Sequence, residues 1–315
     1  MDKIVSIIIP IKPENVNPKV LESLNVLDYP KDKTEILIER GYNPSVQRNK
    51  AIKRAKGDII LFIDDDVDVQ SNLIKEHLKC YTTDKIVAVG GPGITPTNIP
   101  KLQLCFGYVF SSYFGSGPKR ARYTQIGKIR KTGEGELILC NLSMRKDVLS
   151  KELFNENLFY GEENELLTIL EKKSFEFVYN PNAIVYHYPK QTIPTFCRQV
   201  FSYGKNRLQC HVPLSMLSLM PTIFLFYLIA LSILLLFGLI RSYYFIPLIT
   251  YFIFNLLFSL EIAIKNKIWL VSFLPPLFLL FHLNYGASII YSFMKIAKQT
   301  TAFFQKKTTP RVHPD

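Results

Sequence analysis

The stretch Gly57-Asp58-Ile59-Ile60-Leu61-Phe62-Ile63-Asp64-Asp65-Asp66 decides the fold, because it joins a fully apolar strand to three adjacent carboxylates. An apolar run without alternation is typical of a strand that is buried on both faces of a sheet. Three neighbouring carboxylates repel one another unless a cation lies among them. Oxygen ligands of this kind favour hard ions such as Mg²⁺ or Mn²⁺. An acidic loop or a helix cap is the alternative interpretation of the same residues.

The residues before this stretch alternate between strand and helix patterns. The predicted order is strand 4–11, helix 18–27, strand 35–39, helix 45–56 and strand 58–64. This βαβαβ order favours an α/β domain with a parallel sheet that helices cover on both faces. Ligands of such sheets bind beyond the carboxyl ends of the strands, where Glu39 and the three aspartates fall.

The composition changes near Pro213, where mixed polar and apolar sequence gives way to long apolar runs. The runs are 214–240, 243–264 and 268–294, and each reaches the ~20 residues that cross a bilayer as a helix. We therefore expect a soluble domain over residues 1–212, a transmembrane region of about three helices over 213–294, and a basic tail over 295–315.

The formal net charge of +12 is explained by lysines and arginines near a membrane and by anionic substrates. No recognition helix or RNA-binding signature accompanies this charge, so nucleic acid is not an expected partner. The five cysteines are scattered without metal-binding spacing, which is typical of reduced thiols.

The side of the membrane on which the first domain lies is predicted from the beginning of the chain. The apolar stretch 4–11 contains Ser6 and Pro10 and is too short for a signal peptide. A multi-pass protein of the cytoplasmic membrane, with its catalytic domain on the cytoplasmic side, is therefore expected. Three crossings would place the basic tail outside, against the positive-inside tendency. Either one run is a re-entrant or interfacial segment, or the tail is an exception.

A second acidic motif, Gly161-Glu162-Glu163-Asn164-Glu165-Leu166, begins a predicted helix. Acids in a first turn oppose the helix macrodipole, and this accounts for one or two of them. A carboxylate held there, near a metal site, is also suited to act as a general base toward a sugar hydroxyl.

Taken in order, the motifs of this chain resemble those of family 2 glycosyltransferases of the GT-A fold over residues 4–210. They are Ile7-Ile8-Ile9-Pro10, Arg48-Asn49, the stretch 57–66, the motif 161–166 and Arg198-Gln199-Val200-Phe201-Ser202-Tyr203-Gly204. Membrane-anchored bacterial and archaeal enzymes that build surface polysaccharides and lipid-linked sugars are the class that it resembles most. The resemblance implies a GT-A, Rossmann-like domain followed by the transmembrane region.

The resemblance also implies how the donor is bound. Asp64 and Asp66 match the Asp-x-Asp motif and belong to the site of Mg²⁺ or Mn²⁺, with Asp66 on the metal and Asp64 near the ribose. The other implied donor contacts are Pro10, Glu39, Arg48, Asn49 and Asp65. His187 matches a position that reaches the metal or the diphosphate, although a packed or solvated histidine is the plainer interpretation.

Further roles follow from the same resemblance. Glu163 takes the position of the catalytic base, and Glu162 helps to shape the acceptor pocket. Asn141 lies beside the sugar or has a structural role at a β edge. Arg198, Lys205 and Arg207 neutralise the leaving diphosphate or face lipid headgroups.

The implied activity is transfer of a sugar from a nucleotide-diphospho-sugar to a lipid-linked or membrane-proximal glycan, with inversion. The Gln-x-x-Arg-Trp motif of processive synthases is lacking, since the single tryptophan is Trp269, which favours addition of one sugar per binding event. Polyprenyl phosphate is the alternative acceptor. A membrane protein without activity is a third hypothesis, and a transporter is disfavoured because the apolar runs contain few acids.

Overall fold

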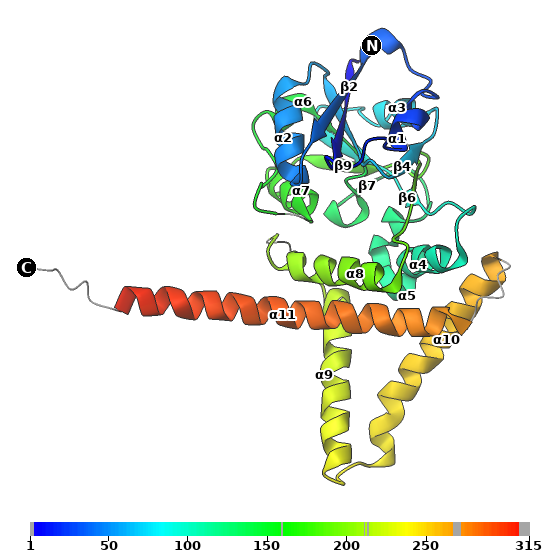
Figure 1. The fold of residues 1–315 in the computed structure, drawn as a ribbon, viewed down its shortest axis with the longest axis vertical. Helices are drawn as coiled ribbons and strands as arrows, with labels where there is room; N and C mark the ends of the chain where they lie inside the picture. Colours follow the sequence, from blue (N-terminus) through cyan, green and yellow to red (C-terminus); the bar gives the residue numbers. More distant parts are fainter. Residues whose placement is uncertain (1–2, 159, 211, 213, 267–271, 309–315) are drawn as a thin grey trace, which may run out of the picture.

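The structure is a computed structural model that describes residues 3–158, 160–210, 212, 214–266 and 272–308. An α/β domain lies above a group of long helices (Figure 1). Phe159, Pro213, Trp269, the start of the third apolar run at 268 and tail residues 309–315 lie outside the described residues.

Seven strands form the main sheet of the α/β domain. Their bounds are β1 Val5–Ile11, β2 Thr34–Arg40, β3 Ile59–Ile63, β5 Ile86–Gly90, β7 Arg130–Thr132, β8 Asn141–Arg145 and β9 Glu176–Tyr179. The strand order is β2-β1-β3-β8-β5-β9-β7. The first three strands are parallel, as the βαβαβ pattern predicts.

The sheet as a whole is mixed, which differs from the expected parallel sheet. Strand β8 is antiparallel to both of its neighbours, β3 and β5. The end of β5 at Gly90 lies beside the start of β8 at Leu142. The chain between them therefore returns to the same edge of the sheet, and β8 runs back in the opposite direction.

Helices cover both faces of the sheet. Successive side chains along a strand point alternately into the hydrophobic core on one face and into the core on the other. The helices are α1 Val20–Leu24, α2 Pro44–Arg54, α3 Leu73–Leu78, α6 Lys146–Leu149 and α7 Glu162–Lys172, with a 3-10 helix η1 at Lys31–Lys33. Ile8, Ile60 and Phe62 pack with α2, α6 and α7. Ile7, Ile9 and Leu61 pack with α1 and α3 on the other face. The predicted two-sided covering is confirmed.

A second, small sheet lies at the carboxyl edge of the first three strands. It contains β4 Val67–Val69, β10 Val185–His187 and β6 Gly93–Ile94, with β10 in the middle. The antiparallel pairing of β10 with β4 places His187 opposite Val67, the residue after the three aspartates.

The underside of the domain is made of helices that pack against the apolar C-terminal part. These are α4 Lys101–Ser111, α5 Tyr113–Ser116, η2 Gly117–Arg122, η3 Glu134–Glu136 and α8 Ile193–Arg207. Phe106 and Phe196 stack with their ring centroids 4.4 Å apart. Both belong to one aromatic core that continues into the long helices through Phe278 and Phe281.

Three long helices follow: α9 Met216–Leu236, α10 Ile246–Asn266 after the 3-10 helix η4 Ser242–Phe245, and α11 Leu274–Thr308. The spans long and apolar enough to cross a membrane are Met216–Leu236, Ser242–Asn266 and Leu274–Lys298. Helix α11 continues past residue 294, where the third apolar run was predicted to end. Residues 295–308 of the predicted basic tail are therefore helical.

The three long helices are not parallel. Helices α9 and α10 form a hairpin that points away from the α/β domain, whereas α11 runs across its base beside α8 (Figure 1). Two glycines permit these crossings: a Cβ at Gly204 of α8 would lie 1.8 Å from Ser288 Oγ, and one at Gly286 of α11 would lie 2.5 Å from the Pro221 carbonyl oxygen. Larger residues at either glycine would force the helices apart.

Candidate active site

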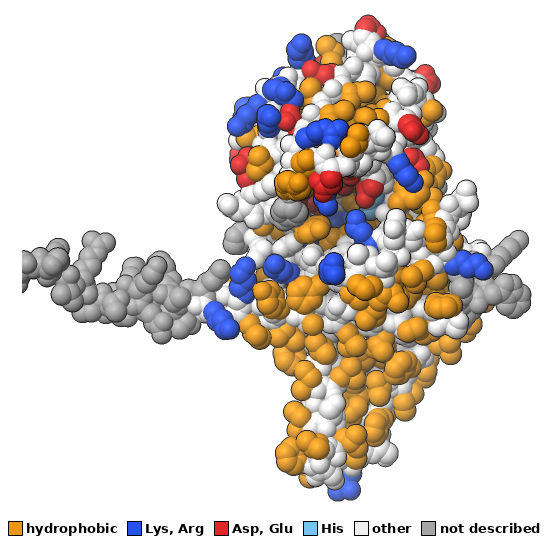
Figure 2. Space-filling view, in the orientation of Figure 1, with side chains coloured by type: hydrophobic (Ala, Val, Ile, Leu, Met, Phe, Trp, Pro, Cys, Tyr) orange, Lys and Arg blue, Asp and Glu red, His pale blue; other side chains and the backbone are white. Residues whose placement is uncertain are grey.

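A cavity of about 1650 Å³ lies between the carboxyl edge of the sheet and the helices beneath it. Basic side chains gather on the surface where the α/β domain meets the apolar helices (Figure 2). Nine residues of the predicted site line the cavity: Pro10, Arg48, Asp64, Asp65, Asp66, Glu162, Glu163, His187 and Arg207. The structure thus brings the aspartates and the Glu162-Glu163 pair into one cleft.

Arg48 connects the two acidic motifs. Its Nη2 donates to Asp64 Oδ1 and its Nη1 donates to Glu162 Oε1, each at 2.8 Å. The side chain of Asn43 accepts from the backbone N–H groups of Ser45 and Val46 and so caps the helix that positions Arg48. Because Arg48 and Glu162 are almost fully buried, this charge-assisted pair fixes the start of α7 against the end of β3.

The other two aspartates have separate partners. Asn15 Nδ2 donates to Asp65 Oδ2 at 2.8 Å, and burial raises the pKa of Asp65. Asp66 Oδ1 lies 3.4 Å from His187 Nε2, and Asp66 Oδ2 lies 3.9 Å from Lys190 Nζ. Desolvation opposes ionisation of Asp66, but His187 outweighs it and lowers the pKa of Asp66 to about 2. Asp66 is therefore an ionised carboxylate that faces the cavity.

The residues suited to a metal are Asp66 and His187. Within the described ranges, no group of three or more His, Cys, Asp and Glu side chains is arranged to hold a metal ion. Asp64, the third predicted ligand, has one oxygen bound by Arg48. A carboxylate and an imidazole at the rim of an open cavity fit a divalent ion that completes its coordination with substrate oxygens and water.

Glu163 lies in the buried first turn of α7. Gly161 precedes it with φ 83°, a conformation that favours glycine, and a Cβ there would lie 2.8 Å from Cys210 Sγ. Burial and the neighbouring Glu162 raise the pKa of Glu163 to about 7, although Arg122 opposes this shift. A carboxylate with this pKa is suited to accept a proton near neutral pH.

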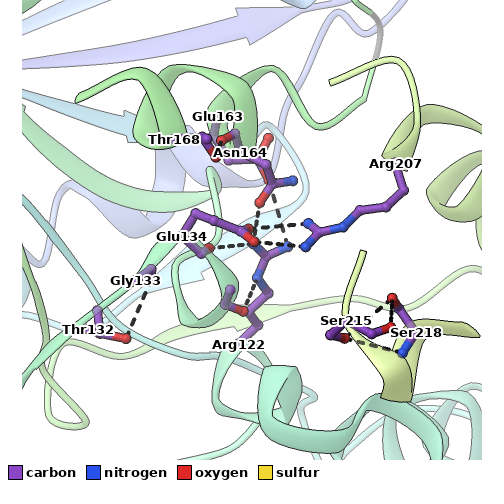
Figure 3. A network of polar contacts seen from close by, with 11 residues as sticks. Arg122, Thr132, Gly133, Glu134, Glu163, Asn164, Thr168, Arg207, Ser215 and Ser218 are labelled. Atoms are coloured by element: carbon purple, nitrogen blue, oxygen red, sulfur yellow. Dashed lines mark hydrogen bonds and ion pairs between the residues drawn. The ribbon is translucent and has the colours of Figure 1, made fainter. Parts of the chain in front are cut away.

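The sequence prediction left out a polar network that surrounds Glu163 (Figure 3). Arg122 Nη1 lies 3.9 Å from Glu163 Oε1, and its Nη2 donates to the Glu134 carbonyl oxygen at 2.7 Å and to Asn164 Oδ1. Arg207 Nη2 donates to Glu134 Oε1 at 2.8 Å. The signals in the sequence were the basic run at 119–122 and the acids at 134 and 136, which sit among glycines without periodicity.

Three of the predicted donor residues do not line the cavity: Glu39, Asn49 and Arg198. Glu39 is buried against α2, where its carboxylate forms ion pairs with Lys50 and Arg54. Asn49 Nδ2 donates to the Phe154 carbonyl oxygen at 2.8 Å and to a carboxylate oxygen of Glu156. In this structure Glu39 and Asn49 hold α2 against neighbouring segments.

Asn141 and Arg198 also lie outside the cavity. Asn141 Nδ2 donates to the Pro92 and Ala183 carbonyl oxygens, and its Oδ1 lies 2.9 Å from His77 Nε2. These contacts fit a structural role, in the interior of the sheet rather than at its edge. Arg198 is exposed on α8. Of the basic residues predicted on α8, Arg207 therefore reaches the site and Arg198 does not.

Residues 36–151 match the model of glycosyl transferase family 2. A curated relative is the dolichyl N-acetyl-alpha-D-glucosaminyl phosphate 3-beta-D-2,3-diacetamido-2,3-dideoxy-beta-D-glucuronosyltransferase of Methanococcus voltae. It is 25% identical over 322 residues, which cover 90% of this chain and 95% of that protein.

Two solved structures are similar over most of this chain. The mannosyltransferase PcManGT of Pyrobaculum calidifontis, in complex with GDP-Man and Mn²⁺, has a TM-score of 0.49 at 10% identity and covers 96% of this chain and 81% of its own. TarS of S. aureus in complex with UDP has a TM-score of 0.41 at 14% identity, with 92% and 91% covered.

The mixed sheet with acids at its carboxyl edge, followed by long apolar helices, defines a GT-A-like domain with a candidate membrane region. Residues 36–151 resemble a family 2 glycosyltransferase domain, and the chain is a glycosyltransferase. The resemblance to the family, the fold class and the enzyme class predicted from the sequence are confirmed.

Proposed function

We propose that this enzyme transfers one sugar from a nucleotide-diphospho-sugar to a hydroxyl of a lipid-linked or membrane-proximal glycan, with inversion and with Mg²⁺ or Mn²⁺. The observation that carries the proposal is the single cleft that contains both the Asp66–His187 pair and the buried Glu163. Arg48, which bonds to both acidic motifs, holds the two halves of the cleft together.

The positions of these side chains support a single displacement at the anomeric carbon. Glu163 accepts the proton of the acceptor hydroxyl, and the acceptor oxygen forms a bond to the anomeric carbon. The bond from that carbon to the nucleotide diphosphate breaks on the opposite side, and the diphosphate leaves with the electron pair. Asp66 and His187 would hold a divalent ion, which stabilises the negative charge of the leaving diphosphate. A single displacement of this kind inverts the anomeric configuration.

A hydroxyl acceptor is favoured over polyprenyl phosphate by the pKa of Glu163. A phosphate acceptor is already ionised and needs no base, whereas a hydroxyl needs a proton acceptor in contact with it. With a pKa of about 7, the Glu163 carboxylate can accept the proton of that hydroxyl at neutral pH. The name of the M. voltae relative, which includes a dolichyl glucosaminyl phosphate, supports a lipid-linked sugar as the acceptor.

The arrangement of the long helices leads to a membrane topology. We propose that α9 and α10 cross the bilayer as a hairpin and that α11 lies along the membrane surface, which is the interfacial alternative that the sequence left open. Each hairpin helix has 21 residues, about 30 Å in length, and this matches the hydrocarbon thickness. Two crossings leave the catalytic domain and the basic end of α11 together on the cytoplasmic side, in agreement with the positive-inside tendency.

A screen for transfer tests the proposed function. The purified full chain is incubated with a panel of nucleotide sugars, Mn²⁺ and an extract of polyprenyl-linked glycans, and labelled lipid product is measured. We expect product with one donor, none with Asp66→Asn, and unchanged product with Asp32→Asn, whose carboxylate lies on η1 away from the cavity. Absence of product and of nucleotide diphosphate binding would instead favour a membrane protein without activity.

A further inference from the structure

The cavity that contains the catalytic acids continues into the apolar helices. Besides the residues of the cleft, its lining includes Met220 and Phe224 of α9 and Pro247, Thr250 and Phe254 of α10. We call these five residues the hairpin groove. They belong to the two helices that we propose to cross the bilayer, so a hydrocarbon chain can enter the groove without exposure to water.

The segment from α5 to η2 joins the hairpin groove to the catalytic cleft. At one end, the Phe114 ring stacks on Phe258 of α10 with centroids 5.3 Å apart and contacts Tyr251 at 5.6 Å. At the other end, Arg122 approaches Glu163. Lys119 lies between them along the chain and also lines the cavity. The nine residues from Phe114 to Arg122 therefore contact the apolar helix α10 at one end and Glu163 at the other.

Lys119 differs from the three arginines that line the cleft. Arg48 binds Asp64 and Glu162, and Arg122 and Arg207 both bind Glu134. The half-buried Lys119 makes no hydrogen bond or ion pair with any of the described residues. Burial and the neighbouring Arg207 and Arg122 lower the pKa of Lys119 to about 7. An incoming anion would stabilise its charged form and gain a charge-assisted hydrogen bond.

We propose that the hairpin groove binds the hydrocarbon chain of a prenyl-type lipid phosphate and that Lys119 binds its phosphate. The inference rests on the proposed function and names the acceptor class: a sugar carried on a lipid phosphate. In this proposal the sugar lies beside Glu163, because Lys119 and Glu163 line the same cavity and interact electrostatically. Charge supports this occupant, since the neighbouring Arg122 and Arg207 are already paired with Glu134, and Lys119 is the cation of these three left for a phosphate.

Binding to the full chain in nanodiscs tests the phosphate contact. The probes are geranylgeranyl phosphate, geranylgeraniol and inorganic phosphate. We expect the lipid phosphate to bind much more tightly than either of the others. Lys119→Met should weaken its binding about tenfold, the loss of one hydrogen bond between charged groups, and should leave geranylgeraniol unaffected. Lys128→Met, an exposed lysine outside the cavity, is the matched control and should change nothing.

A second pair of variants tests the hairpin groove. Thr250→Trp fills it, whereas Leu257→Trp adds the same ring on α10 at an exposed position outside the cavity. Geranylgeranyl phosphate should bind at least tenfold more weakly to Thr250→Trp than to Leu257→Trp, and dimethylallyl phosphate should bind equally to both. Equal binding of geranylgeranyl phosphate to both variants would overturn the proposal and would indicate a groove filled by membrane lipids.

Two further outcomes also oppose the inference. If inorganic phosphate binds as tightly as the lipid phosphate, the site is one for free phosphate. If geranylgeraniol binds as tightly as geranylgeranyl phosphate, the phosphate adds nothing to binding and Lys119 does not contact it. Mn²⁺-dependent binding of nucleotide diphosphates is measured on the same samples and shows that each variant is folded. If the wild type does not bind nucleotide diphosphates, the proposed function fails. The binding of lipid phosphate tests the hairpin groove and Lys119 independently of that result.

Discussion

Arg122 Nη1 lies 3.9 Å from Glu163 Oε1, on a segment more than forty residues away in the sequence. This guanidinium is the main cation that opposes the rise in the pKa of Glu163, and Glu134 and Asn164 hold it in place. Arg122 is therefore a positioning residue that keeps part of the Glu163 population ionised at neutral pH.

Replacing Arg122 should move the pH dependence of transfer. In Arg122→Gln the pKa of Glu163 rises further, so the acidic limb of the rate profile shifts to higher pH and the rate at pH 7 falls roughly fivefold. At pH 9 most of the rate should return, since Glu163 is then ionised. Rate profiles of Arg122→Gln and Arg120→Gln check this, because Arg120 lies two residues before Arg122 and does not line the cavity. Equal profiles would refute the positioning role.

Glu163→Gln should lower the rate of transfer by about 10²–10⁴ because the proton acceptor is lost. Full turnover in this variant would instead identify an ionised acceptor such as polyprenyl phosphate. Asp147→Asn, at the exposed start of α6, is a control carboxylate substitution that should leave the rate unchanged.

The same Glu163→Gln substitution should stabilise the protein at alkaline pH. The folded pKa of about 7 lies above the ordinary value of 4.5, so the stability that protonation gives is present below pH 4.5 and is lost as the pH rises to about 7. At pH 8 the neutral glutamine should add stability on the order of 2 kcal/mol, with a smaller effect at pH 5. Thermal unfolding at the two pH values measures the difference, and an effect of equal size at both would contradict the shifted pKa.

Arg48→Met should destabilise the fold by about 3 kcal/mol, because it leaves the buried Glu162 carboxylate without its partner. The double variant Arg48→Met with Glu162→Gln should recover part of this loss, since the uncompensated charge is removed. Denaturant titrations of the single and double variants provide the test. No recovery in the double variant would mean that the cost does not arise from the buried charge.

The membrane topology predicts opposite labelling of two engineered cysteines. Arg241→Cys, between α9 and α10, should react with an impermeant maleimide from outside the cell. Lys298→Cys, on α11, should react only in inside-out vesicles. The unsubstituted chain gives the background, because four of its five cysteines are buried. Labelling of Lys298→Cys from outside would restore three crossings and contradict the surface position of α11.

The acidic edge of the sheet could be predicted from the sequence because each part has a strong local pattern. The apolar run before Asp64 specifies a buried strand, and βαβ topology brings its carboxyl end beside those of its neighbours. The prediction of the first five elements succeeded for this reason. The antiparallel direction of β8 was not predictable. The long stretch before this strand has no periodicity that indicates at which end of the sheet the chain re-enters it.

Other features depend on tertiary contacts. Glu39 lies at a strand end as expected, but Lys50 and Arg54 on α2 bind its carboxylate away from the cavity. Helix α11 has the composition of a membrane span, and its direction follows from close packing at Gly204 and Gly286. Composition determines that such a helix is apolar, whereas packing against the α/β domain determines how it is oriented.

The central claim is that the cleft containing Asp66, His187 and Glu163 binds a divalent ion together with a nucleotide diphosphate. Calorimetric titration of UDP and GDP into the full chain, with and without Mn²⁺, tests it most directly. We predict binding of at least one nucleotide diphosphate that requires Mn²⁺, is abolished by Asp66→Asn and is retained by Asp32→Asn. Binding that needs no Mn²⁺ and survives Asp66→Asn, or no binding at all, would contradict the account.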